Sequence, residues 1–153
     1  MRAFIFPGQG SQAVGMGKAL AEASSTAKEV FQEVDHALEQ NLFNLMCEGP
    51  EDELTLTENA QPAIMANAIA FLRVMEKEGG KTVAELCSYV AGHSLGEYTA
   101  LCGSGAINLT TTAKLLKLRG QSMQKAVPVG EGGMAALLGA DIKKASRLAK
   151  AII

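Results

Sequence analysis

The sequence contains few cysteines, which cross-link small secreted domains through disulfides, and few histidines, which with cysteines bind metal ions. Its 153 residues include no tryptophan, two histidines and three cysteines. Cys47, Cys87 and Cys102 are odd in number and widely spaced, without a CxxC pair. This pattern favours buried or free thiols over a disulfide framework or a zinc site. We therefore expect free thiols, no bound metal and a reducing compartment, the cytoplasm.

The sequence also lacks a large excess of positive or negative charge, and it lacks long apolar runs. Fourteen basic against sixteen acidic residues give a net charge of -2, without the basic patch of a nucleic-acid-binding protein. The stretch PAIMANAIAFL is interrupted by Asn67 and is shorter than the roughly 20 residues that a membrane span needs. The apolar residues before Pro7 are too few for a signal peptide. We expect a soluble domain that binds neither nucleic acid nor membrane.

What is present is an alternation of strand and helix patterns, which indicates an α/β fold with a parallel sheet. Short apolar runs before glycine-rich turns predict strands over residues 2–6, as a buried strand, and over 86–92. Apolar residues at helical spacing predict helices over residues 24–40, 58–78 with a deeply buried interior, 94–101, 110–125 and from 141 onward. A flexible junction at 128–133 and a further strand at 134–139 complete the pattern.

One turn between a predicted strand and a predicted helix carries the pattern Gly92-His93-Ser94-Leu95-Gly96. In a G-x-S-x-G turn the serine occupies a strained corner, and the two small residues let the backbones pass closely. The corner also aims the amide of the next residue, Leu95, toward an oxyanion on the attacked carbonyl. We predict that Ser94 is a nucleophile, although a glycine-flanked serine also serves as a plain helix N-cap.

A serine nucleophile needs a base, and the chain offers only His36 and His93. The side chain of His93 should diverge from that of its neighbour Ser94, which leaves it to pack or orient the loop. His36 lies on the polar side of its predicted helix and is expected at the surface. We therefore predict that neither histidine is the base.

Four motifs occur in one chain: FPGQGSQAVGMG, TENAQPAI, GHSLGEYTAL and KLRGQSM. In order and spacing they closely resemble the malonyl-CoA:acyl carrier protein transacylases and the related acyltransferase domains of fatty-acid and polyketide synthases. The following segment, GGMAALLGA, is similar to the first strand of that family's small subdomain. The resemblance implies an α/β-hydrolase-like parallel sheet with helices, the large subdomain, interrupted by a ferredoxin-like small subdomain.

The resemblance also implies an activity in fatty-acid biosynthesis. Ser94 would take a malonyl group from coenzyme A as an ester and pass it to the phosphopantetheine thiol of acyl carrier protein. Malonyl-CoA and the carrier thiol would be substrates, and no cofactor would be bound permanently. Members of this family are expected to be monomeric when complete.

Further site residues follow from the resemblance, position by position. Gln9 corresponds to the glutamine whose backbone amide joins that of Leu95 in the oxyanion hole. Arg119 corresponds to the arginine that pairs with the free malonyl carboxylate, and a planar guanidinium suits that group because it binds a carboxylate bidentately. Gln61 and His93 would belong to the same substrate-binding site.

Family members are longer than this chain, which bears on how much of the domain is present. The resemblance implies that residues 1–126 form the first part of the large subdomain and residues 127–153 the start of the small one. The catalytic histidine would then lie beyond residue 153. The corresponding hypothesis is a truncated, nicked or partly covered transacylase. Alone it would be inactive, because its base would lie in the missing C-terminal part of the same enzyme, which is then an expected partner.

Two other functions stay open from the residues alone. A serine esterase or thioesterase would use the same turn with water in place of the carrier thiol, although Arg119 and the GQGSQ loop count against it. An inactive fragment would bind acyl-CoA or a partner chain without turnover, and the lack of a suitable histidine keeps this reading open.

Overall fold

A computed structural model describes residues 1–126 and 137–151 of the chain. Two short strands, β1 (Ala3–Phe6) and β2 (Tyr89–Gly92), form a parallel sheet in which Phe6 pairs with Gly92. The other elements are helices: α1 (Lys18–Ala23), α2 (Ser25–Leu38), α3 (Leu42–Glu48), α4 (Glu51–Thr55), α5 (Thr57–Gly79), α6 (Val83–Leu86), α7 (Leu95–Gly103), α8 (Leu109–Ala126) and α9 (Ile142–Ala151). The described part is therefore mostly helical with a small parallel sheet, which confirms the predicted α/β class.

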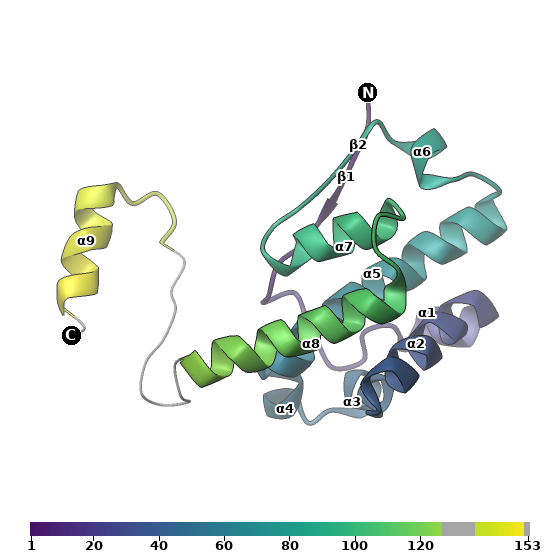
Figure 1. Cartoon of the computed structure of the whole chain (residues 1–153), viewed down its shortest axis with the longest axis horizontal. Coiled ribbons are helices and arrows are strands. Elements are labelled where there is room, and N and C mark those ends of the chain that lie inside the picture. The colour runs from purple at the N-terminus through teal and green to yellow at the C-terminus, as the bar shows by residue number, and fades with distance from the viewer. Residues whose placement is uncertain (127–136, 152–153) are drawn as a thin grey trace.

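The long helix α5 forms the centre of the main body. It contacts α2, α7 and α8, and Figure 1 shows α8 crossing it. Met65 and Ile69 on α5 are buried against a core that includes Phe31 and Leu116. The predicted burial of the interior of α5 is wrong for Phe71, which is 56% exposed, because its side chain lines an open groove and not the core.

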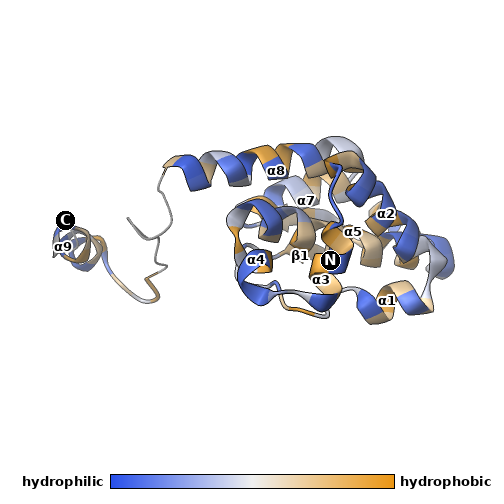
Figure 2. Ribbon diagram, turned by 90° about the horizontal axis from the view of Figure 1, so that it is seen from below, coloured by the Kyte–Doolittle hydropathy of each residue, from blue (hydrophilic) through white to orange (hydrophobic). Residues whose placement is uncertain are grey.

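The helices that pack on α5 are amphipathic, as helical spacing of their apolar residues predicts. Figure 2 shows hydrophilic and hydrophobic residues alternating along α2 and α8. Ser24 caps α2, accepting a hydrogen bond from the amide of Ala27 at 3.4 Å. Asn108 precedes α8 and accepts from the amide of Thr111 at 2.8 Å. These caps explain why both helices begin within one or two residues of the predicted starts.

The sheet agrees with the predicted strands in position but not in burial or length. The second strand begins at Tyr89 and not at residue 86, because Thr82 and Glu85 form a capping box that starts the short helix α6. The first strand is not buried as predicted, since Ile5 is 69% exposed. Its side chain lines a groove of about 880 Å³ together with Phe4, Ile64 and Phe71.

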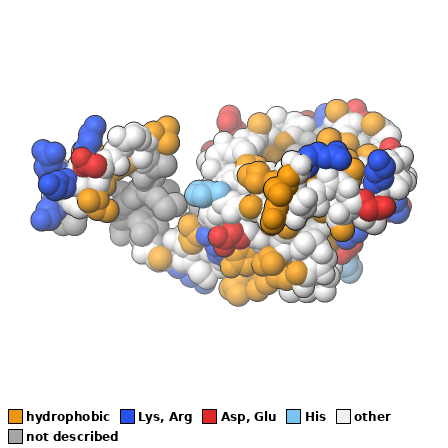
Figure 3. Space-filling view, turned by 90° about the horizontal axis from the view of Figure 1, so that it is seen from above, with side chains coloured by type: hydrophobic (Ala, Val, Ile, Leu, Met, Phe, Trp, Pro, Cys, Tyr) orange, Lys and Arg blue, Asp and Glu red, His pale blue; other side chains and the backbone are white. Residues whose placement is uncertain are grey.

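The C-terminal helix α9 stands apart from the main body (Figure 1). Its exposed lysine and arginine side chains gather away from the hydrophobic patches of the main body (Figure 3). The predicted junction at 128–133 lies outside the described residues, as does most of the strand predicted at 134–139. In the described ranges, no helix has both the length and the apolar character needed to cross a membrane.

Candidate active site

The turn between β2 and α7 holds Ser94 in a conformation that side chains rarely adopt. Ser94 precedes α7 with φ 57° and ψ -113°, and it is one of two non-glycine residues with positive φ among those described. A non-glycine residue in such a region costs about 1–3 kcal/mol, and such strain concentrates at functional sites. Ser94 does not act as a plain N-cap, because its side chain makes no capping hydrogen bond. That Ser94 is a nucleophile stays a prediction, and the strained turn is the conformation that this role requires.

Both flanking glycines are required by close approach of backbones. A Cβ atom on Gly92 would overlap the carbonyl group of Gly96, and a Cβ on Gly96 would overlap the carbonyl oxygen of Phe6. The first contact closes the turn on itself, and the second packs the start of α7 against the end of β1. The sequence pattern therefore works as predicted, with each glycine removing a specific steric conflict.

The loop after β1 lies directly beside this turn. The amide of His93 donates to the carbonyl of Phe6 at 3.2 Å, and a Cβ on Gly8 would lie 2.7 Å from Nδ1 of His93. The side chain of Gln9 donates from Nε2 to Oγ1 of Thr57 at 3.2 Å. Leu95 is the first residue of α7, where amides have no partner within the helix. The loop that contains Gln9 and the start of α7 that contains Leu95 therefore lie side by side.

Arg119 on α8 joins two of the other predicted site residues. Its Nη2 donates to Oγ of Ser94 at 2.9 Å, and its Nη1 donates to Oε1 of Gln61 at 2.6 Å. Gln61 is fully buried on α5 and donates from Nε2 to Sδ of Met123 at 3.3 Å. Three residues that are distant in sequence therefore meet, and the cation lies against the proposed nucleophile.

Several residues around Arg119 were not singled out from the sequence. The guanidinium carbon lies 5.9 Å from the centre of the Tyr98 ring, a cation–π distance. Tyr98 is four residues after Ser94, so a helical reading of GHSLGEYTAL could have placed it one turn along α7. Met123 had a similar signal, since it lies four residues after Arg119.

A polar cluster lies beside this group, where α5 and α8 cross. Lys117 and Glu58 form an ion pair of 3.2 Å, and Gln121 donates to the same carboxylate oxygen at 3.2 Å. Burial alone would raise the pKa of Glu58, but the hydrogen bonds from Gln121 and Lys117 and the charge of Lys117 lower it below its ordinary value. Glu58 is therefore held as a carboxylate.

Neither histidine hydrogen-bonds to Ser94, although both lie within the described residues. His36 is exposed near the end of α2, and His93 is exposed beside Gly8. That neither is the base stays a prediction. In the described ranges, no group of three or more histidine, cysteine, aspartate or glutamate side chains is arranged to hold a metal ion.

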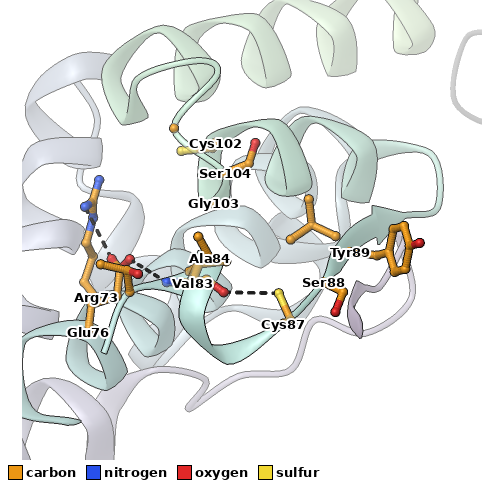
Figure 4. A pocket seen from close by; sticks show the side chains of 13 residues that line it. Arg73, Glu76, Val83, Ala84, Cys87, Ser88, Tyr89, Cys102, Gly103 and Ser104 are labelled. Atoms are coloured by element: carbon orange, nitrogen blue, oxygen red, sulfur yellow. Dashed lines mark hydrogen bonds and ion pairs between the residues drawn. The ribbon is translucent and has the colours of Figure 1, made fainter. Parts of the chain in front are cut away.

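A cavity of about 520 Å³ lies elsewhere, between α6, β2 and the end of α7 (Figure 4). Its lining includes Cys87 and Cys102, which are free thiols like Cys47. Burial raises the pKa of Cys102 and disfavours the reactive thiolate. Neither Ser94 nor Arg119 lines this cavity, so it is separate from the candidate active site.

Comparison with known proteins assigns the arrangement to a family. Residues 3–152 match the Acyl transferase domain family. The chain belongs to this family. Over 139 residues it is 50% identical to the malonyl CoA-acyl carrier protein transacylase of Bacillus subtilis, which covers 91% of this chain and 42% of that protein. The resemblance seen in the four motifs is therefore confirmed.

Solved acyl transferases have the same fold over the matched part. The acyl-carrier-protein-S-malonyltransferase from Bartonella henselae aligns with a TM-score of 0.90 and 55% identity, covering 99% of this chain and 48% of that one. A malonyl-transacylase solved in complex with a type II PKS acyl-carrier protein aligns with a TM-score of 0.84 and 42% identity, covering 97% and 47%. The chain thus spans somewhat less than half the length of these relatives.

Proposed function

We propose that the chain carries the nucleophile and the acyl-selecting arginine of a malonyl-CoA:acyl carrier protein S-malonyltransferase of fatty-acid biosynthesis. The main support for this proposal is that Arg119 hydrogen-bonds to both Ser94 and Gln61. A cation held at the nucleophile suits an acyl group that ends in a carboxylate. Relatives named malonyl CoA-acyl carrier protein transacylase, 50% and 45% identical, support the same activity.

The first half-reaction forms a malonyl ester on Ser94. The Oγ atom attacks the thioester carbonyl of malonyl-CoA while a base takes its proton, and the carbonyl oxygen becomes an oxyanion. Backbone amides of Gln9 and Leu95 donate to that oxyanion. The carbonyl re-forms, the carbon–sulfur bond breaks, and the coenzyme A thiolate takes the proton back from the base. Transfer to the phosphopantetheine thiol of acyl carrier protein repeats these steps in reverse.

Arg119 selects the substrate in this proposal. The guanidinium uses one N–H on Ser94 and one on Gln61, which leaves three of its five donors for the malonyl carboxylate. Gln61 orients the guanidinium from a fully buried position. His93 completes the substrate-binding side of the turn. An acetyl group has no carboxylate to accept hydrogen bonds from these three donors.

The finer points of organisation belong to the same proposal. Residues 1–126 would form the first part of an α/β-hydrolase-like large subdomain, and residues 127–153 the start of a ferredoxin-like small one. The acting enzyme would be a cytoplasmic monomer that binds coenzyme A thioesters and acyl carrier protein. A relative solved with an acyl-carrier protein supports this choice of partner.

Binding without turnover is the second candidate, because the Ser94 hydroxyl accepts a hydrogen bond from Arg119 and neither of the two described histidines hydrogen-bonds to it. Intact mass spectrometry after incubation with malonyl-CoA separates the two. The transferase proposal predicts a malonyl adduct that Ser94→Ala abolishes. Bound malonyl-CoA without an adduct on the folded, complete enzyme would contradict it and favour binding alone.

The role of Arg119 has its own test, which is the ratio of malonyl to acetyl adduct. We expect Arg119→Ala to lower malonylation of Ser94 by roughly a hundredfold, since the loss leaves a desolvated carboxylate unpaired. Acetylation should change far less. Lys114→Ala, an exposed cation on the same helix, is the matched control. Equal losses for malonyl and acetyl groups would contradict the proposed selection.

A further inference from the structure

The crossing of α5 and α8 brings two backbones into direct contact at Gly120. A Cβ atom there would lie 2.5 Å from Cα of Glu58 and 2.7 Å from the carbonyl oxygen of Thr57. Gly120 follows Arg119 directly, so the tightest point of the crossing is one residue from the selecting arginine. Contact alone fixes the distance between the helices, but it leaves α8 free to rotate about its own axis.

Lys117 binds α5 and Gln40, which follows the end of α2, on one side of this contact. Its Nζ donates to Oε1 of Gln40 at 2.8 Å and to Oδ1 of Asn59 at 2.9 Å, and it pairs with Oε2 of Glu58 at 3.2 Å. The three donors of the ammonium thus have three acceptors. With a side chain only 20% exposed, Lys117 is not an ordinary solvated surface lysine.

Arg119 and Met123 bind α5 on the other side of the contact at Gly120, and both hydrogen-bond to Gln61. Successive residues of a helix are about 100° apart around its axis, so Lys117 and Arg119 point roughly in opposite directions. Gly120 lies between Lys117 and Met123 in this circular order. The helix α8 is therefore held at the point of contact and on both sides of it.

We infer that Lys117, together with Glu58, is a positioning pair for Arg119. Lys117 resists rotation of α8, and any such rotation would carry the long Arg119 side chain away from Ser94. The hydrogen-bond partners of the pair are Gln40, Asn59 and Gln121 and do not include Ser94, so its effect passes through the placement of the guanidinium. The importance of that placement for acyl selection rests on the role proposed for Arg119 above.

The test measures how firmly the Arg119 guanidinium is held in the substrate-free chain. Nitrogen-15 NMR shows separate Nη signals for a restrained guanidinium and averaged signals for a free one, and Arg119→Lys assigns them. We expect separate signals in the wild-type chain and averaged signals in both Lys117→Met and Glu58→Gln. Lys114→Met removes an exposed lysine from the same helix and should leave the signals separate.

Separate Arg119 signals in folded Lys117→Met would overturn the inference. Circular dichroism establishes whether each variant is folded, and if Lys117→Met does not fold, the milder Glu58→Gln decides by the same signals. A loss of packing alone would lower the melting temperature without averaging the Arg119 signals, so unchanged signals in a less stable variant also count against the inference.

A second readout connects the pair to selectivity. We expect Lys117→Met to lower the ratio of malonyl to acetyl adduct on Ser94 roughly tenfold or more, because a displaced catalytic-site group costs rate steeply. Glu58→Gln should lower it less, and Lys114→Met not at all. A complete wild-type enzyme without any malonyl adduct would contradict the proposed function, whereas the NMR comparison would still decide whether Lys117 positions Arg119.

Discussion

The two regions that form the candidate active site are built in different ways. The turn at Ser94 is specified by the glycines of five consecutive residues, Gly92 to Gly96, which avoid steric conflicts within the turn and with the end of β1. The crossing of α5 and α8 joins residues about 60 positions apart through side-chain hydrogen bonds such as Lys117 to Asn59. The turn fixes the nucleophile through the backbone, whereas the crossing fixes the arginine through side chains. Substitutions in the turn should therefore lower the free energy of unfolding strongly, and those in the crossing should lower it by smaller and varying amounts.

Gly92→Ala should have the largest effect. The new Cβ would overlap the backbone of Gly96, so the turn must deform, at a cost of roughly 3 kcal/mol or more. Urea unfolding followed by circular dichroism measures the loss. Gly79→Ala is the control, since no atom lies within 4 Å of a Cβ there; equal stability of the two variants would show that the turn is not sterically closed.

Gly120→Ala tests the crossing at its closest point. Because Cα of Glu58 and the carbonyl oxygen of Thr57 stand 2.5 Å and 2.7 Å from the new Cβ, α8 must move away from α5. We expect a loss of about 1–3 kcal/mol in the free energy of unfolding, smaller than in the turn because two helices separate more easily than a closed turn opens. A loss as large as that of Gly92→Ala would contradict the contrast between the regions.

Ser94→Gly should raise stability while removing the nucleophile. Glycine adopts positive φ without strain, so the variant should gain about 1 kcal/mol in the free energy of unfolding. Thermal unfolding provides the measurement. Ser104→Gly, where φ is -83°, should lose stability instead. A less stable Ser94→Gly variant would mean that the turn does not store strain at Ser94.

Glu58→Gln should have the smallest effect, and one that depends on pH. The pKa of Glu58 in the folded chain lies below its ordinary value of 4.5. Its stabilising contribution is therefore present above pH 4.5 and is lost as the pH falls through the folded-state pKa. Wild type and Glu58→Gln should differ in melting temperature near pH 7, and the difference should disappear as the pH falls through the folded-state pKa of Glu58. A difference that is constant over this range would exclude the charge as its cause.

The sequence predicted the elements that rest on strong local signals. Helices α2, α5, α7 and α8 and both strands lie within a few residues of their predicted bounds, because caps and apolar periodicity act over short distances. The short helices α1, α3, α4 and α6 were not predicted, since fewer than two turns give little periodicity. The burial of Ile5 and Phe71 was predicted wrongly because an apolar side chain does not by itself show which face another element covers.

The sequence by itself determined the glycine-flanked turn at Ser94, the family and the identity of the residues to examine, because each depends on short motifs with fixed spacing. Only the tertiary structure placed Arg119 against Ser94 and Gln61 and joined Lys117 to Glu58, Asn59 and Gln40. These contacts join α5 and α8 to the turn before α7 and to the residue Gln40 after α2, and their hydrogen bonds form only when the crossing at Gly120 sets distance and rotation together. A motif names the residues of such a site, but helix packing decides which atoms meet.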